Sequence, residues 1–348
     1  MNNKITIKDV AKKAEVSPST VSLVLSGKGN ISEDVRNRVY EAAKQLDYIK
    51  PVHASSIAVK HISHIAILVC EDYEKAFEWN FIRHMLINLE SEITKKQYYP
   101  VIIPVSFAHE PNKIMEKIVL SKAGAVLSIH YGNPELFQQL ETQEIPVVLI
   151  NNSQYQDQFY TVCADVVQGA YKATKYLLSL GHTQIALADY HRPDMPGIVH
   201  DVFLGFKKAL EEEEVTFPES DRITVNLYNE EELHEKLHRV FHETHHPPTA
   251  LLAHDDYFAA RIFSAFHHLN IQVPADVSLT ALGDTLDYNQ SFIPKITTVR
   301  LNNDLLGKIA GEMILQRLQN NHQKEIDVLK VNYQLEERES CRLLLSGA

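Results

Sequence analysis

The sequence has few cysteines and none of the spacings that cysteine chemistry requires. Its 348 residues include only Cys70, Cys163 and Cys341, with no CxxC pair, which excludes a disulfide scaffold and is typical of a reducing compartment. No apolar run approaches the roughly 18 residues of a membrane span. The first residues, MNNKITIKDV, lack the apolar core of a signal peptide. We therefore expect a cytoplasmic protein without a membrane partner.

Glycine is scarce as well. With 12 glycines the chain contains neither GxxxxGK[ST] nor GxGxxG, the loops that cradle nucleotide phosphates, and we expect no cofactor. Apolar residues make up 45% and charged residues 23%, as in ordinary globular proteins. At about 150 residues per domain, the length predicts two or three folded units.

The charge is unevenly distributed along the chain. The formal net charge is −11, which by itself argues against a protein that coats nucleic acid, because phosphates attract cations. Residues 1–60, however, carry ten Lys/Arg against six Asp/Glu, a net +4, so the remaining residues sum to −15. This asymmetry predicts a small basic module joined to a large acidic body.

The first sixty residues read as three short helices. Thr6 and Asp9 have the spacing of a helix cap, Ser17 precedes Pro18 at a second helix start, and Ser32 precedes a third helix. Apolar residues recur at helical spacing in all three. A second helix after a tight turn is the layout of a helix-turn-helix, although any three-helix bundle shares it. The hydroxyl groups of the second helix favour DNA, since they can bond phosphates or base edges.

The segment TIKDVAKKAEVSPSTVSLVLSGKGNISEDVRNRVYEAAKQLDY resembles the N-terminal domain of the LacI (lac repressor) family of bacterial transcription regulators. The resemblance implies base contacts by Pro18, Ser19 and Leu23. It implies contacts with the DNA backbone or neighbouring bases by Thr6, Ser17, Thr20, Ser22, Ser26 and Asn30. The family usually has Arg where this chain has Leu23, so an apolar contact, for instance with a thymine methyl, would replace a bidentate grip on guanine.

The segment after Tyr48 resembles the hinge of that family, which folds into a minor-groove helix on the operator. The resemblance places Ile57 at the position that wedges between base steps and Ala54 beside it. Lys50-Pro51 replaces the usual Pro-Asn start of the hinge. A plain linker is the alternative interpretation of this segment.

From residue 63 onward, buried apolar runs alternate with helical patterns. Strands are expected at 64–69, 101–103, 125–127 and 146–150, and again near 184–188, 222–226, 249–253 and 277–282. Helices are expected near 80–96, 166–180, 203–214, 230–244 and 255–270. Such alternation is typical of parallel sheets covered on both faces. Two such units in tandem leave a cleft that suits a small ligand.

This body also resembles the LacI family, in its periplasmic-binding-protein-like effector domain. The matching pieces include Leu180-Gly181-His182, Pro248-Thr249-Ala250 and Val273-Pro274-Ala275-Asp276. The resemblance implies an all-α helix-turn-helix head and an α/β body of two doubly wound parallel-sheet subdomains. The expected boundaries are 1–47 for the head, 48–62 for the hinge, 63–163 and 294–325 for the N-subdomain, and 164–293 and 326–348 for the C-subdomain.

The resemblance carries effector residues over only in part. Asp284 matches an Asp that bonds ligand hydroxyls, Asp255 stands where Asn is usual beside Asp256, and Val202 replaces a frequent ligand-binding Arg. Trp79, in the loop expected after the first strand, could stack on a sugar or serve only as lid packing. Weaker candidates at strand ends are Glu71, Tyr131, Asn151, His191 and Tyr288. Glu71, Asp255 and Asp284 together suit a neutral sugar or polyol, since carboxylates accept hydrogen bonds from hydroxyls.

One stretch matches HExxH, the zinc-protease motif, at His234–His238 and again at His242–His246. The region is rich in His and Glu, so chance matches are expected. Leu233, Leu237, Val240 and Phe241 define a buried face, and Pro247-Pro248 ends the helix near the second match. A solvated helix face is the preferred interpretation, with no metal site. Adventitious surface metal binding is left open.

The sequence thus predicts a non-enzymatic DNA-binding transcription regulator, a repressor that binds double-stranded operator DNA. It would act as a homodimer on a pseudo-palindrome, since no leucine heptads follow residue 340 to build a tetramer. A small-molecule effector, a sugar or polyol, would control it. Control by a protein corepressor or a non-sugar ligand remains open. A solute-binding protein without DNA function is disfavoured by the basic head.

Overall fold

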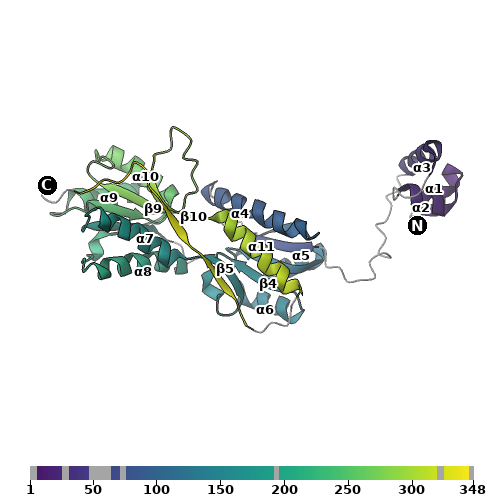
Figure 1. The fold of residues 1–348 in the computed structure, drawn as a ribbon, viewed down its shortest axis with the longest axis horizontal. Coiled ribbons are helices and arrows are strands. Elements are labelled where there is room, and N and C mark those ends of the chain that lie inside the picture. The colour runs from purple at the N-terminus through teal and green to yellow at the C-terminus, as the bar shows by residue number, and fades with distance from the viewer. Residues whose placement is uncertain are drawn as a thin grey trace. The chain divides into compact units, whose positions relative to one another are not determined.

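We analysed a computed structural model of the chain. The structure describes residues 6–25, 31–46, 64–70, 76–191, 196–319 and 325–344. The chain divides into two compact units, Met1–His61 and Ile62–Ala348, which are described separately (Figure 1). In the described part of the chain, no helix is long and apolar enough to cross a membrane.

The first unit is a bundle of three helices, α1 (Ile7–Ala14), α2 (Pro18–Leu25) and α3 (Glu33–Gln45). One apolar face of each helix meets the others, and the shared core contains Val10, Val21 and Val39, all fully buried. The chain leaves α1 through Glu15, whose left-handed backbone (φ 54°) makes the tight turn. The predicted three-helix head is confirmed.

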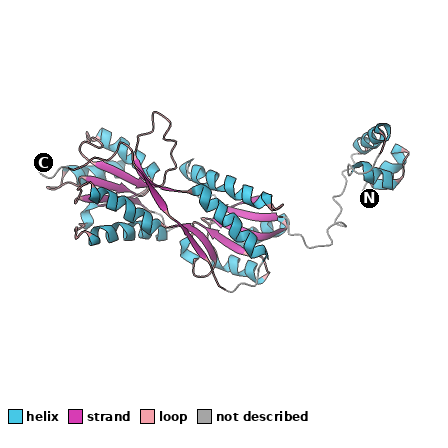
Figure 2. Cartoon of the chain, viewed as in Figure 1, coloured by secondary structure: helices cyan, strands magenta, loops and turns pink. Residues whose placement is uncertain are grey.

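The second unit contains two six-stranded sheets, which define two subdomains (Figure 2). The N-subdomain consists of β1 (His64–Cys70), α4 (Ala76–Lys95), β2 (Tyr99–Val105), α5 (Pro111–Ser121), β3 (Ala123–Ile129), α6 (Pro134–Thr142), β4 (Val147–Ile150), β5 (Tyr160–Ala164), α11 (Asn303–Gln319) and β11 (Val328–Val331). The C-subdomain consists of α7 (Val166–Ser179), β6 (Ile185–Tyr190), α8 (Pro196–Glu212), β7 (Arg222–Val225), α9 (Glu230–His242), β8 (Ala250–Ala253), α10 (Asp256–His268), β9 (Ser278–Leu282), β10 (Thr297–Leu301) and β12 (Tyr333–Glu336).

The two sheets repeat one strand order. The first runs β11-β5-β4-β3-β1-β2 and the second β12-β10-β9-β8-β6-β7. All pairings are parallel except β10 with β12. The predicted fold class, a helix-turn-helix head and a body of two doubly wound subdomains, is confirmed, with this one antiparallel strand added.

The chain passes between the subdomains three times. It crosses after β5, again between β10 and α11, and finally between β11 and β12, which Asn332 alone separates. The sequence analysis placed the last two crossings at about 294 and 326. Both come later, because β10 still pairs in the second sheet and β11 in the first. The predicted hinge, 48–62, lies outside the described residues.

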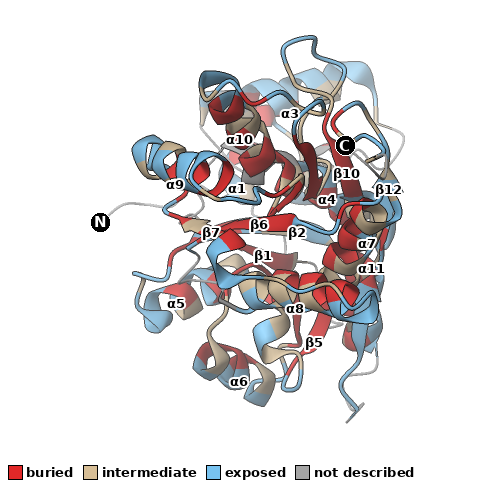
Figure 3. Ribbon diagram, turned by 90° about the vertical axis from the view of Figure 1, so that its left-hand side faces the viewer, coloured by how far each residue is buried: buried red, intermediate tan, exposed pale blue. Residues whose placement is uncertain are grey.

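The core of each subdomain lies between the sheet and the helices on its two faces (Figure 3). Central strands such as β3, β4 and β9 are buried along their whole length, as expected for parallel strands covered on both sides. Glycines allow one helix pair in each subdomain to pack closely. A Cβ at Gly307 of α11 would lie 2.3 Å from the Met85 oxygen of α4, and one at Gly205 of α8 would lie 2.1 Å from the Val167 oxygen of α7.

Candidate functional site

The second helix of the head presents hydroxyl groups and the apolar side chains of Pro18 and Leu23 to solvent. Ser17 caps α2, since its Oγ accepts a hydrogen bond from the Thr20 N–H at 3.1 Å. The same oxygen lies 2.6 Å from Ser19 Oγ and 2.8 Å from Thr20 Oγ1. Ser19 is exposed and Leu23 is 41% exposed, whereas Val21 on the opposite side is buried. This outer face is small enough for the helix to approach another surface closely.

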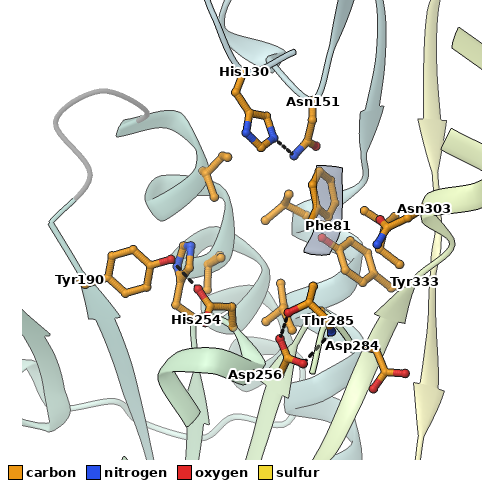
Figure 4. Close-up of a pocket in the computed structure, with 17 residues that line it drawn as sticks. Phe81, His130, Asn151, Tyr190, His254, Asp256, Asp284, Thr285, Asn303 and Tyr333 are labelled. Atoms are coloured by element: carbon orange, nitrogen blue, oxygen red, sulfur yellow. Dashed lines mark hydrogen bonds between the residues drawn. The ribbon is translucent and has the colours of Figure 1, made fainter. Parts of the chain in front are cut away.

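A cavity opens between the two subdomains, beside the carboxyl ends of strands from both sheets (Figure 4). This is where doubly wound α/β domains bind ligands. Its empty volume, including the open mouth, is about 790 Å³. The lining residues are Phe81, His130, Asn151, Val166, Tyr190, Ile198, Val202, His254, Asp255, Asp256, Leu282, Gly283, Asp284, Thr285, Leu301, Asn303 and Tyr333. We call this cavity the effector pocket.

The N-subdomain contributes an imidazole, an amide and a ring. His130 and Asn151 directly follow β3 and β4, and both have left-handed backbones, with φ of 59° and 52°. His and Asn tolerate this conformation better than most residues. Asn151 donates from Nδ2 to Nε2 of His130 at 2.9 Å, and the Phe81 ring stacks on that imidazole at 5.5 Å between centroids. The turns after two neighbouring strands thus aim a neutral polar pair into the pocket.

The C-subdomain contributes carboxylates. Asp255 follows β8 and caps α10, where its Oδ1 accepts from the Phe258 N–H at 2.7 Å. Its other oxygen accepts from the hydroxyl of Tyr190 at the end of β6. The Tyr190 ring meets His254 edge-on at 4.7 Å. Asp255 is therefore held by both the helix terminus and the neighbouring strand.

Asp256 is fully buried and holds the loop that follows β9. Its carboxylate accepts from the Thr285 N–H at 2.6 Å, from Thr285 Oγ1 at 2.8 Å and from the Leu286 N–H at 2.9 Å. Burial raises the pKa of Asp256 to about 6, against the lowering effect of these hydrogen bonds, and the charge of Asp255 adds to the rise. The loop that forms one edge of the pocket is thus tied to a buried acid.

Asp284, in the same loop, pairs with a cation behind the pocket. Arg338 donates from Nη2 to Asp284 Oδ1 at 2.7 Å, and Thr298 donates to the same oxygen at 2.9 Å. The Arg338 guanidinium also lies 3.8 Å from the centre of the Tyr288 ring. The carboxylate of Asp284 is therefore largely neutralised before any ligand arrives.

Comparison with known proteins connects these two features. Residues 6–50 match the model of bacterial regulatory proteins of the lacI family, and residues 174–341 match that of the periplasmic binding protein-like domain. Residues 6–50 therefore form a LacI-family head. A relative of this chain, the HTH-type transcriptional repressor PurR of Escherichia coli O139:H28 (strain E24377A / ETEC), is 29% identical over 339 residues, covering 96% of both chains.

Solved structures show the same fold. The lac repressor dimer bound to operator and the anti-inducer ONPF has a TM-score of 0.73 and 20% identity, covering 98% of this chain and 100% of that one. The transcriptional regulator CelR in complex with cellobiose has a TM-score of 0.68 and 21% identity, covering 97% and 99%.

The structure describes most of the residues predicted to contact DNA. In this LacI-family head, Thr6, Ser17, Pro18, Ser19 and Leu23 are exposed, and Thr20 and Ser22 are half-buried. Thr6 is occupied as a cap, because its N–H and Oγ1 donate to Asp9 Oδ2 at 2.8 and 2.7 Å. Ser26, Asn30, Ala54 and Ile57 lie outside the described residues.

The predicted effector residues divide into two groups. Asn151, Asp255 and Asp284 line the effector pocket. Tyr131 does not, because its side chain is buried in the N-subdomain core against Phe107 and Phe137. Tyr288 lies behind the pocket lining, on Arg338 and Asp256. His191 is exposed and is not among the lining residues.

Two other predicted residues have a different outcome. Trp79 belongs to helix α4 and not to a loop, because α4 begins at Ala76, four residues before the predicted start. Its side chain lies outside the described part of the structure, as does the whole of Glu71.

The sequence analysis did not identify several lining residues. The histidines His130 and His254 follow β3 and β8 directly, so the position after each apolar strand was the available signal. Tyr190 is the last residue of its strand. No comparable indication exists in the sequence for Phe81, Asn303 and Tyr333. They reach the pocket because of how α4, α11 and β12 pack against the sheets.

The histidine-rich helix has the buried face that was predicted. Leu233, Leu237, Val240 and Phe241 of α9 are buried, and the helix ends at His242, so the second HExxH match does not lie on it. His238 is exposed and lies 3.2 Å from Glu243. Within the described residues, no three His, Cys, Asp or Glu side chains are grouped to hold a metal ion.

Proposed function

We propose that the protein is a sequence-specific DNA-binding transcription regulator that represses by binding a pseudo-palindromic operator as a homodimer. A small ligand in the effector pocket would control it. The observation that carries the proposal is the LacI-family head in one chain with a pocket between two α/β subdomains. Relatives with this organisation include a named repressor and a repressor dimer bound to operator.

The face of α2 supports a role in reading the major groove. Ser17, Ser19 and Leu23 are exposed, and the hydroxyls lie on a helix start without bulky neighbours. Hydroxyl groups can bond phosphates or base edges, and Leu23 can contact a thymine methyl. We propose that these residues, with Pro18, Thr20 and Ser22, form the DNA-reading surface.

The pocket supports control by a small hydroxylated ligand of the sugar or polyol class. Its lining combines apolar surface with amide, imidazole, phenol and carboxylate groups. CelR, which shares the fold, was solved with cellobiose. Such a ligand would shift DNA affinity by binding two arrangements of the subdomains unequally. We propose that the protein acts in the cytoplasm, where operator DNA lies, and catalyses no reaction.

Operator binding by head variants tests this proposal. An operator is first selected from random DNA with the full-length protein, and its affinity is then measured by fluorescence anisotropy. We expect Thr20→Ala to weaken binding about fivefold, the loss of roughly one hydrogen bond, and the affinity to fall steeply with added salt. Thr142→Ala, at an exposed threonine of the body, is the control and should bind normally.

Two results would contradict the proposal. One is the failure of the full-length protein to enrich any sequence. The other is a Thr20→Ala variant that retains full affinity and folds normally by circular dichroism.

A further inference from the structure

The effector pocket has more negative than positive side chains. Asp255, Asp256 and Asp284 all line it, and none of the described lining residues is Lys or Arg. The C-subdomain supplies all three carboxylates: Asp255 caps α10, Asp256 is the first residue of that helix, and Asp284 lies in the loop after β9. Figure 4 shows Asp256 and Asp284 at the pocket. A pocket lined in this way repels anions and concentrates cations.

Only one of these carboxylates has a cationic partner in the described structure. Arg338 pairs with Asp284 at 2.7 Å. Asp255 and Asp256 are adjacent in sequence, and the described ion pairs include neither of them. Their recorded partners are N–H and hydroxyl donors, which leave the net negative charge in place. Charges near a protein interior interact more strongly than in water, so this pair would attract a positive group.

The rest of the lining supplies what an organic cation needs. Phe81, Tyr190 and Tyr333 are aromatic residues of the pocket lining, with the hydroxyl of Tyr190 toward the pocket, and aromatic rings attract cations. Asn303 contributes a buried Oδ1 that has no hydrogen-bond donor among the described residues. A buried acceptor without a donor is costly, so a ligand N–H or O–H would stabilise it.

We propose that the ligand of the effector pocket is a hydroxylated amine, for example an amino sugar. This inference rests on the proposed function, in which the pocket holds the regulatory ligand. The ammonium group would lie against Asp255 and Asp256, the carbon skeleton against the aromatic rings, and a donor of the ligand would reach Asn303 Oδ1. Sugar phosphates and sugar acids are excluded by the same charges.

Three sugars of one ring size test the charge of the ligand. Full-length protein is titrated calorimetrically with D-glucosamine, D-glucose and D-glucose 6-phosphate, which are cationic, neutral and anionic. We expect glucosamine to bind at least about tenfold more tightly than glucose, since one charge interaction of moderate strength has that effect. We expect no measurable heat from the phosphate, and a glucosamine affinity that falls as salt is added.

A matched pair of variants tests the residue. Asp255→Asn keeps the Oδ1 that caps α10 and removes one charge, so it should lower the ratio of glucosamine to glucose affinity by about tenfold. Asp287→Asn removes a charge from the exposed part of the neighbouring loop, outside the pocket lining, and should leave the ratio unchanged.

The proposal is overturned if glucose binds as tightly as glucosamine, if glucose 6-phosphate binds best, or if none of the three sugars binds. An unchanged ratio in Asp255→Asn also overturns it. Operator binding by the unmodified protein without sugar is measured separately. Its presence would show that only the ligand class has failed, and its absence would show that the proposed function itself has failed.

Discussion

The two subdomains of the body share one strand order but contribute opposite chemistry to the pocket between them. In both sheets, five parallel strands occur in the same order. The sixth strand, β11 in the first sheet and β12 in the second, lies at the same edge, beside β5 and β10 respectively. The N-subdomain lines the pocket with the neutral pair His130 and Asn151. The C-subdomain lines it with Asp255, Asp256 and Asp284.

This difference separates what the topology decides from what single residues decide. Strand order determines which loops meet at the pocket, because the carboxyl ends of parallel strands lie at one edge of the sheet. The first two or three residues after each strand then determine the charge. Two sheets with the same strand order can therefore line a pocket with either neutral or acidic side chains. Substitutions at matched positions show whether the two subdomains also differ in stability.

The largest expected effect is on the free energy of unfolding, and it concerns two arginines that each pair with an acid. Arg338 pairs with Asp284 in the C-subdomain and Arg317 with Glu141 in the N-subdomain, both at 2.8 Å or less. Asp284 is 11% exposed and Glu141 28%. We expect Arg338→Met to destabilise by about 3 kcal/mol, because it leaves a nearly buried charge unpaired. Arg317→Met should cost only about 1 kcal/mol, because Glu141 can be hydrated.

Urea unfolding followed by circular dichroism measures both effects. An Arg317→Met variant that loses as much stability as Arg338→Met would contradict the idea that burial of the acid decides the cost.

The second prediction tests a similarity between the subdomains. A Cβ at Gly205 or at Gly307 would collide with a backbone oxygen of the neighbouring helix, at 2.1 and 2.3 Å. We expect each Gly→Ala substitution to cost about 1–3 kcal/mol, the usual range for overpacking. Gly197→Ala is the control, since nothing lies within 4 Å of its added Cβ, and it should be neutral or slightly stabilising.

Thermal unfolding of the three glycine variants, recorded side by side, provides the measurement. If Gly205→Ala and Gly307→Ala unfold at the temperature of the unmodified protein, the helix pairs are not limited by close approach at these positions.

The smallest effect concerns acid sensitivity of the C-subdomain. His182 is fully buried, with Thr249 Oγ1 2.9 Å from Nδ1 and the Arg342 oxygen 3.1 Å from Nε2. Burial lowers the pKa of His182 below 6.5, so the unfolded chain binds more protons in the range below pH 6.5. The stability contributed by the neutral ring is therefore lost as the pH falls below 6.5.

Urea midpoints at pH 7.5, 6.5 and 5.5 measure this loss. His182→Gln should show a weaker decline toward low pH than the unmodified protein, whereas His267→Gln, at an exposed histidine, should decline normally. Equal pH dependence in all three proteins would rule out His182 as a source of acid sensitivity.

Strands and helices were predicted correctly where the pattern within the element itself was clear. Buried strands such as β3 and β9 were predicted because apolar residues dominate them and they are buried along their whole length. The strands β11 and β12 were missed because each has only four residues, several of them exposed, so neither forms a buried apolar run that marks a strand. The helix α8 begins at Pro196, seven residues before the predicted start. The prediction began too late because the pair Pro196-Gly197 is typical of a loop.

Prediction of the pocket was limited in the same way. Asp255 and Asp284 were predicted from the resemblance to the LacI family, and Asn151 from its position at a strand end; all three line the pocket. Tyr131 was wrong as a lining residue, because the turn after β3 directs its side chain into the core and His130 toward the pocket. A side-chain direction in a turn depends on backbone angles such as the φ of 59° at His130, which the strand pattern does not reveal.

The sequence by itself determined the basic head, its three helices and the alternation of strands and helices. These follow from charge, caps and apolar spacing, which act between residues close along the chain, while the resemblance to the LacI family came from its motifs. Tertiary structure alone decided that Asp284 is neutralised by Arg338 and that Asn303 and Tyr333 reach the pocket. Those facts depend on contacts between residues far apart in sequence, which packing of the whole body brings together.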